Sequence, residues 1–327
     1  MSILEVAELA VTYITEGGDV PAVRGVDLRI EPGEVLGLAG ESGCGKSTMG
    51  LALLRLLPDG TKVSGRVQLD GRDVLAMSKS EVRAVRWSQA SIVFQGAMHS
   101  LDPVIRVGDQ IAEAMIAHGS QDGRRAITAR VSELLEQVGI PARRARDFPH
   151  EFSGGQRQRV MIAMALACEP KLVIADEPTT ALDVMVQAQV LRLLNDLQRD
   201  LGLAMLFITH DLSVLTEVSD RLAIMYAGRI VEEGPAREVF ESPQHPYTRA
   251  LAAAFPKIGD ERFVGRPAGL GGDPPDPREL PAGCTFAPRC PEVFDRCVQV
   301  DPPLFAAGEG RRSACLLVED ASVEGAR

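Results

Sequence analysis

One short stretch, GESGCGKST at residues 40–48, restricts the folds open to this chain more than any other feature. It follows the apolar run VLGLAG (35–40) and precedes the helical pattern STMGLALLRLL (47–57). A strand, a glycine-rich loop and a helix in this order form a phosphate-binding loop, because the glycines let backbone N–H groups point at phosphate oxygens. The sequence therefore predicts an α/β protein that binds the phosphates of a nucleotide.

The loop residues have distinct expected roles. Lys46 is expected to reach the β- and γ-phosphates, and the hydroxyl of Ser47 to bind Mg²⁺. The helix that begins near Lys46 adds the positive end of its dipole. Further phosphate contacts are expected from Gly40, Ser42, Gly43, Gly45 and Thr48.

A second apolar run, LVIAD (172–176), is a predicted strand that ends in one acid and is followed directly by another within the stretch LVIADEP (172–178). Asp176 is expected to hold the Mg²⁺ shell, and Glu177 to orient and deprotonate the attacking water. Hydrolysis of a phosphoanhydride depends mainly on positioning and charge stabilisation, so these groups suffice. An Asp-Glu pair alone is more often a solvated strand end, but the phosphate loop favours the catalytic interpretation.

Two further runs, SIVFQ (91–95) and AMLFIT (204–209), are also apolar at nearly every position. Such runs are typical of strands buried on both faces of a parallel sheet, with helices such as 186–202 between them. Apolar and polar residues alternate with a period of two in 22–30 and 65–71, which predicts strands of a smaller antiparallel element near the N-terminus.

Composition excludes several function classes. The 327 residues carry a formal net charge of −10, which argues against a sequence-independent nucleic-acid binder. The N-terminus lacks the pattern of a signal peptide, and the longest apolar run, 160–168, is too short to cross a membrane. We therefore expect a cytoplasmic protein whose thiols stay reduced.

The motif FSGGQRQRV (152–160) resembles the signature motif of ABC ATPases, with Phe152 where leucine is commoner. The resemblance implies a RecA-like P-loop domain over residues 1–235, with a helical subdomain at about 97–165. It also implies that two such units pair head to tail, so that the signature motif of one contacts the nucleotide of the other. By this resemblance the nucleotide contacts include the adenine-stacking Tyr13, the γ-phosphate sensor and Mg²⁺ ligand Gln95, the signature residues Ser153, Gly154, Gly155 and Gln156, the D-loop Asp183 and the switch residue His210.

The sequence FESPQHPYTRALAAAFP (240–256) resembles the C-terminal extension of oligopeptide and dipeptide importer ATPases. This resemblance implies ATP-driven import, with two permease subunits, a second related ATPase subunit and an extracytoplasmic solute-binding protein as partners, at the cytoplasmic face of the membrane. The alternatives are a soluble ABC ATPase of DNA repair or ribosome handling, and a non-enzymatic regulatory module. Residues 236–283 are then the extension and a Pro/Gly-rich linker.

The last segment, 284–327, gathers four cysteines: Cys284, Cys290, Cys297 and Cys315. Their spacing lacks the paired knuckles of structural zinc sites, and many prolines predict that the segment has no regular structure. Such a segment needs a staple to fold. Since the tails of some peptide-importer ATPases resemble this pattern and carry a [4Fe–4S] cluster, we rank a cluster ahead of zinc, and zinc ahead of no metal.

Overall fold

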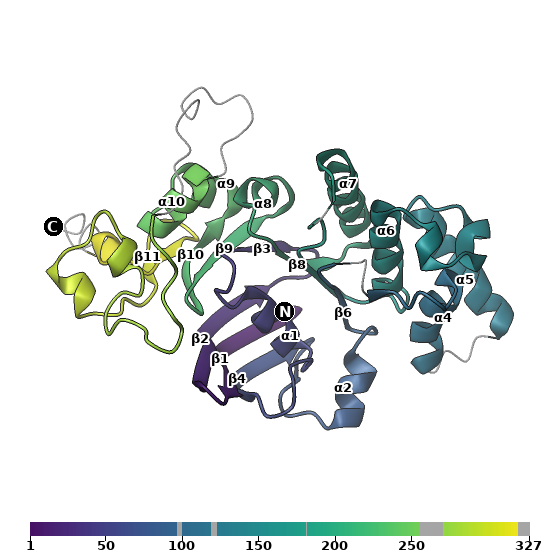
Figure 1. The fold of residues 1–327 in the computed structure, drawn as a ribbon, viewed down its shortest axis with the longest axis horizontal. Helices are drawn as coiled ribbons and strands as arrows, with labels where there is room; N and C mark the ends of the chain where they lie inside the picture. The colour runs from purple at the N-terminus through teal and green to yellow at the C-terminus, as the bar shows by residue number, and fades with distance from the viewer. Residues whose placement is uncertain (97–99, 119–122, 181, 255–270, 320–327) are drawn as a thin grey trace. The chain divides into compact units, whose positions relative to one another are not determined.

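A computed structural model describes residues 1–327 except 97–99, 119–122, 181, 255–270 and 320–327 (Figure 1). The first residues of the predicted helical subdomain, Ala181 of the D-loop motif and parts of the predicted linker and tail therefore lie outside the described residues. The chain forms two compact units. The first unit comprises Met1–Leu4, Ile30–Glu34 and Gln68–Leu206, and the second unit comprises Glu5–Arg29, Val35–Val67 and Phe207–Arg327.

The second unit contains a sheet built around β3 (Val35–Ala39), whose five residues are all buried. β3 pairs in parallel with β9 (Arg221–Tyr226), and β9 pairs antiparallel with β10 (Arg229–Pro235) (Figure 1). Burial at every position explains why this strand shows no polar alternation. The helices of this unit are α1 (Lys46–Leu53), α8 (Leu212–Val218), α9 (Ala236–Glu241) and α10 (Pro246–Ala254).

A second sheet near the N-terminus has the strand order β2-β1-β4-β5, of which β5 is only two residues long. The predicted strands at 22–30 and 65–71 fall largely within β2 and β4. The strands are β1 (Leu4–Thr15), β2 (Gly18–Ile30) and β4 (Lys62–Leu69).

The first unit contains β6 (Ala90–Val93) and β7 (Leu172–Asp176), which pair in parallel. β7 is buried along its whole length, as its apolar sequence predicts, and β8 (Ala204–Ile208) is its other neighbour. The short β5 (Arg72–Asp73) pairs antiparallel with the end of β4. Among its described residues, this unit forms the helices α2 (Lys79–Val85), α4 (Val107–Ala117), α5 (Arg124–Gln137), η1 (Ala142–Arg146), η2 (Pro149–Glu151), α6 (Gly154–Ala165) and α7 (Val184–Leu201).

Helix α1 is shorter than its sequence pattern predicts. The pattern extends to residue 57, but the helix ends at Leu53. Arg55 takes a left-handed conformation with φ 51°, and the N–H of Leu56 donates to the carbonyl of Leu51. These backbone bonds satisfy the last carbonyls of the helix and stop it one turn early.

The cysteine segment has more regular structure than the sequence predicts. β12 (Arg312–Ser313) pairs antiparallel with β10, and β11 (Phe305–Ala306) pairs with β12. The segment also forms the single turns η4 (Ala287–Arg289) and η5 (Asp295–Val298). A small apolar cluster supports these elements; its members are Ala287, Cys297 and Leu316, with Cys284, Phe294 and Phe305 packed against them. The expectation of a tail without regular structure was wrong, because pairing with β10 supplies the hydrogen bonds that the tail cannot make alone.

Candidate nucleotide-binding site

The phosphate loop connects β3 to α1 in the second unit, and two of its glycines are sterically required. Gly40 has φ 156° and Gly45 has φ 107°, conformations that side chains disfavour. A Cβ at Gly40 would lie 2.2 Å from the carbonyl oxygen of Met225, and one at Gly45 would lie 2.2 Å from that of Ala22. Only glycine therefore lets the loop pass this close to the neighbouring backbone.

Lys46 lies inside the loop, with only 5% of its surface exposed. Its Nζ donates to the carbonyl oxygens of Gly40 (2.7 Å) and Glu41 (2.9 Å), and it lies 3.7 Å from Sγ of Cys44. Burial raises the pKa of the Cys44 thiol. The first turn of α1 contains no acidic residue. A buried cation and the positive end of a helix thus face the loop, which suits an anion such as phosphate.

Two more predicted residues belong to the second unit. The hydroxyl of Tyr13 lies 3.1 Å from Oγ1 of Thr48, so the aromatic ring is tied to the helix that follows the phosphate loop. His210 directly precedes α8, whose N-cap is Asp211; that carboxylate accepts from the N–H groups of Ser213 and Val214. The short cap fixes the chain at the point where His210 leaves β8.

The first unit holds the predicted Mg²⁺ ligand Asp176 and the predicted catalytic base Glu177. Asp176, at the end of β7, is buried, and Glu177 follows it with φ 44°, which is left-handed backbone. Oε2 of Glu177 accepts from Nε2 of Gln95 at 2.7 Å and from Oγ1 of Thr180 at 2.8 Å. The structure therefore brings Gln95 and Glu177 into direct contact, which the sequence did not predict, and adds Thr180, which no motif indicated.

The signature motif opens helix α6 in the first unit. Oγ of Ser153 accepts from the N–H of Gln156, and Oε1 of Gln156 accepts from the N–H of Ser153, which makes a reciprocal capping box. A Cβ at Gly155 would lie 2.3 Å from Cγ1 of Val186 on α7, so this glycine allows the two helices to approach closely. Asp183 caps α7 by accepting from the N–H of Val186 at 3.0 Å.

The predicted Mg²⁺ ligands are divided between the units. Ser47 belongs to the second unit, whereas Gln95 and Asp176 belong to the first. Their convergence on one ion therefore stays a prediction. Each unit alone nevertheless shows local geometry that fits its assigned part: a phosphate cradle in the second unit, and in the first a hydrogen-bonded Glu177 carboxylate next to the buried Asp176.

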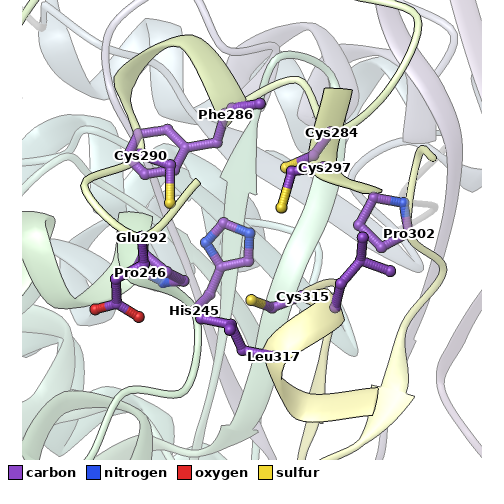
Figure 2. A pocket seen from close by; sticks show the side chains of 12 residues that line it. His245, Pro246, Cys284, Phe286, Cys290, Glu292, Cys297, Pro302, Cys315 and Leu317 are labelled. Carbon is purple, nitrogen blue, oxygen red and sulfur yellow. The ribbon is translucent and has the colours of Figure 1, made fainter. Parts of the chain in front are cut away.

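The four cysteines of the tail line one pocket, and Figure 2 shows their side chains around a common space. The ring of His245 lies among them, and the cavity between these side chains has a volume of about 20 Å³. Burial lowers the pKa of His245 to about 4, and raises the pKa of the Cys284 thiol to about 11. Burial also raises the pKa values of Cys290 and Cys315. The sequence noted the four cysteines as one group, and the structure places them around one pocket, but the sequence gave no reason to place a histidine beside them.

The structure does not bear out a single-ion metal site here. Among the described residues, no group of three or more His, Cys, Asp or Glu side chains has the arrangement needed to hold a metal ion. A zinc ion needs its ligands to converge on one point at about 2.3 Å, and these thiols do not do so. The zinc alternative is therefore unsupported, and the iron–sulfur prediction is not confirmed.

Two residues to which the sequence assigned no part in nucleotide binding contact the phosphate loop directly. Arg289 of the cysteine segment binds the carboxylate of Glu41, and the hydroxyl of Tyr247 accepts from the N–H of Glu41. The hydrogen bonds to Glu41 raise the pKa of Arg289 above its usual range. Tyr247 belongs to the HPYT stretch, which the sequence singled out without assigning it a task.

Comparisons with known proteins agree with this geometry. Residues 23–180 match the ABC transporter family, and residues 231–297 match the C-terminal region of oligopeptide/dipeptide transporters. The chain is 45% identical over 315 residues to the oligopeptide transport ATP-binding protein OppD of Salmonella typhimurium, covering 96% of this chain and 93% of that protein. It belongs to the ATP-binding proteins of ABC transporters, in the oligopeptide branch.

Other relatives of this ABC protein differ in length. It is 46% identical to the oligopeptide transport ATP-binding protein OppD of Mycobacterium tuberculosis, covering 97% of this chain but 52% of that protein. The chain thus spans about half the length of the mycobacterial relatives that it matches.

Among solved structures, cbiO1 from Clostridium perfringens, part of the ABC transporter complex cbiONQ, matches with a TM-score of 0.64 and 31% identity, covering 74% of this chain and 91% of that one. A dimeric post-hydrolysis state of the ATP-binding cassette MJ0796, bound to ADP and Pi, matches with a TM-score of 0.63 and 29% identity, covering 72% of this chain and 99% of that one. The fold is that of an ABC ATPase. Across the described residues, no helix combines the length and apolarity required to traverse a membrane.

Proposed function

We propose that this chain hydrolyses ATP to ADP and phosphate and so powers the import of peptides, or of a related small solute, through an ABC transporter. The observation that carries the proposal is a contact between the phosphate loop and the segment that resembles peptide transporters. A phosphate loop with a buried Lys46 is hydrogen-bonded to Tyr247, which lies within the stretch that matches oligopeptide/dipeptide transporters.

Different residues would bind the phosphates, hold Mg²⁺ and activate the attacking water. The loop and Lys46 bind the phosphates, while Ser47, Gln95 and Asp176 would hold the Mg²⁺ that neutralises charge on the β- and γ-phosphates. Glu177 takes a proton from the water that attacks the γ-phosphorus, and the bond to the β-phosphate oxygen breaks to release ADP. Gln95 and Thr180 fix the carboxylate of Glu177 by hydrogen bonds. His210 contacts the γ-phosphate.

The proposed assembly is a head-to-tail pair of related ATPase subunits on two permease subunits, at the cytoplasmic face of the membrane, served by an extracytoplasmic solute-binding protein. The dimeric state recorded for the similar cassette supports pairing. The N-terminus of α6 carries the positive end of the helix dipole and has no acidic residue in its first turn, which suits contact with a phosphate held by a partner. Nucleic acid is not a proposed partner.

Co-purification tests this function against a soluble role in DNA repair or ribosome handling. The chain, expressed with its genomic neighbours and extracted in mild detergent, should be recovered with two permease subunits. Its ATPase rate in vesicles should rise when the solute-binding protein and peptide are added. Recovery with ribosomes or DNA, and without membrane subunits, would contradict the import proposal.

We also propose that the four-cysteine pocket holds a [4Fe–4S] cluster in a structural role. The donor set fits, because four cysteine thiolates are the usual ligands of such a cluster. All four cysteines line one pocket, so the fold brings the donor set together. When bound, the cluster would supply a covalent staple between Cys284, Cys290, Cys297 and Cys315, and its assembly must displace the thiol protons.

Anaerobic purification tests the cluster. The protein should be brown and contain about four irons per chain, and Cys290→Ser should lose both the colour and the iron. Cys168→Ser is the matched control, because this cysteine lies in the first unit. Stoichiometric zinc without iron, or no metal at all, would overturn the assignment.

A further inference from the structure

The second residue of the phosphate loop, Glu41, makes an unusual contact with the far end of the chain. Its carboxylate accepts two hydrogen bonds from the guanidinium of Arg289, at 2.7 and 2.9 Å. The two residues are 248 positions apart, and the side chains are only 22% and 5% exposed. Bidentate, largely buried pairs of this kind fix geometry as well as charge.

The backbone of the same residue is held independently. The N–H of Glu41 donates to the hydroxyl of Tyr247 at 2.8 Å. The ring of Tyr247 is buried against Tyr226 and Phe286, with centroids 4.6 and 5.4 Å away. Since these aromatic contacts leave the phenol little freedom, the N–H of the loop has a fixed acceptor.

Arg289 also joins the loop to the rest of the C-terminal segment. Its Nε donates to the carbonyl of Gly271 at 2.9 Å, and its Nη1 donates to the hydroxyl of Tyr226 at 3.3 Å. The next residue, Cys290, lines the four-cysteine pocket. Loop residues 41–44 and the prolines at 274, 275 and 277 line another pocket together, so this segment forms one wall beside the phosphate loop.

The charge of Glu41 explains why such contacts are needed. A carboxylate in a loop that binds polyphosphate repels its ligand, and the repulsion is strong where water is scarce. Arg289 neutralises that charge and holds the carboxylate in one direction. The carbonyl of Glu41 meanwhile accepts from Lys46, so displacement of this residue would also disturb the lysine.

We propose that Arg289 and Tyr247 are positioning residues for ATP: they hold Glu41, and through it they keep the phosphate loop shaped and neutralised for the nucleotide. The C-terminal segment that contains Tyr247 and Arg289 then contributes to ATP binding by this chain. This inference rests on the proposed ATPase function and assigns that site two further residues.

ATP binding to the full-length chain tests the proposal, measured by calorimetry in EDTA so that no hydrolysis occurs. Arg289→Gln should weaken ATP binding about tenfold, the equivalent of ~1.4 kcal/mol. Tyr247→Phe should weaken it in the same direction. The control is Arg312→Gln. Arg312 lies in the same segment and pairs with the carboxylate of Glu233, so its substitution removes a comparable ion pair and should leave the affinity for ATP unchanged.

A second variant separates positioning from general loss of structure. Glu41→Gln combined with Arg289→Gln removes the unpaired carboxylate, so ATP binding should return to within about threefold of wild type. In the assembled transporter, Arg289→Gln should raise the KM for ATP while kcat stays near wild type. A merely structural role would predict that the double variant binds no better than Arg289→Gln.

The outcomes are distinct. If the wild-type chain does not bind ATP, the proposed function fails. If the wild type binds ATP and the Arg289→Gln chain, folded by circular dichroism, binds it equally well, only the positioning role is overturned. If that variant does not fold, Tyr247→Phe decides, and an unchanged affinity in it overturns the proposal.

Discussion

At the scale of single residues, replacing one carboxylate oxygen of Glu177 by an amide nitrogen should stop ATP hydrolysis without stopping ATP binding. Glu177→Gln preserves the shape and can still accept from Gln95 and Thr180, but the amide cannot take a proton from water. We expect turnover to fall by a factor of about 10²–10⁴ while ATP binding persists, so a closed, ATP-loaded pair should accumulate. Phosphate release by the assembled complex measures the change.

The control for this substitution is Glu169→Gln. Glu169 shares the left-handed backbone, with φ 51°, but forms an ion pair with Arg130. Its substitution tests whether removing a charge at such a position affects turnover by itself. Near-normal phosphate release from Glu177→Gln would remove Glu177 from the role of catalytic base.

The site residues that the sequence can indicate are those that fall at fixed spacing within a local motif. Gly40, Gly45 and Lys46 fall at fixed offsets in one loop, and the short distances to Met225 and Ala22 explain the glycines. Glu41 occupies a position of the phosphate-loop motif that any residue can fill, so the sequence does not indicate that Arg289 is its partner. A contact that spans 248 positions depends on how distant segments pack, and no local pattern encodes it.

At the scale of secondary-structure elements, the crossing of α6 and α7 depends on Gly155. Gly155→Ala puts a methyl group 2.3 Å from Cγ1 of Val186, and the resulting overpacking should lower the free energy of unfolding by about 1–3 kcal/mol. Gly154→Ala is the matched control, since its nearest neighbour, Cδ2 of Leu182, lies at an ordinary 3.6 Å. Urea denaturation compares the two, and equal loss would show that helix propensity outweighs packing.

Elements buried on every face were the easiest to predict. β7 has the predicted bounds, because an apolar residue at every position leaves no other placement for it. The two-residue strand β12 was missed, since so short a segment has no periodicity of its own. It exists because β10 offers an edge to pair with, which only the assembled sheet reveals.

At the scale of the whole molecule, the chain should need a partner to complete its ATP site. Ser153 lies in the first unit and the phosphate loop in the second, and we propose that Ser153 serves a nucleotide held by the partner subunit. Ser153→Arg places a long cation at the N-terminus of α6, where it opposes the helix dipole and blocks a phosphate. ATP hydrolysis by the complex should fall sharply, while ATP binding to this chain's own loop stays at the wild-type affinity.

The control Ser153→Thr keeps a hydroxyl that can cap α6, so it should preserve both stability and closure. Loss of the cap alone costs about 1 kcal/mol, too little to abolish assembly, and Ser153→Ala measures that contribution separately. ATP-dependent pairing, followed by size-exclusion chromatography in the Glu177→Gln background, reports closure directly. If Ser153→Arg chains still close with ATP, or if this chain alone forms a fully active homodimer that supports transport, the pairing with a second, related subunit is wrong. If closure is lost while each chain still binds ATP, the defect lies in the contact between subunits, which is where a head-to-tail pair places the signature motif.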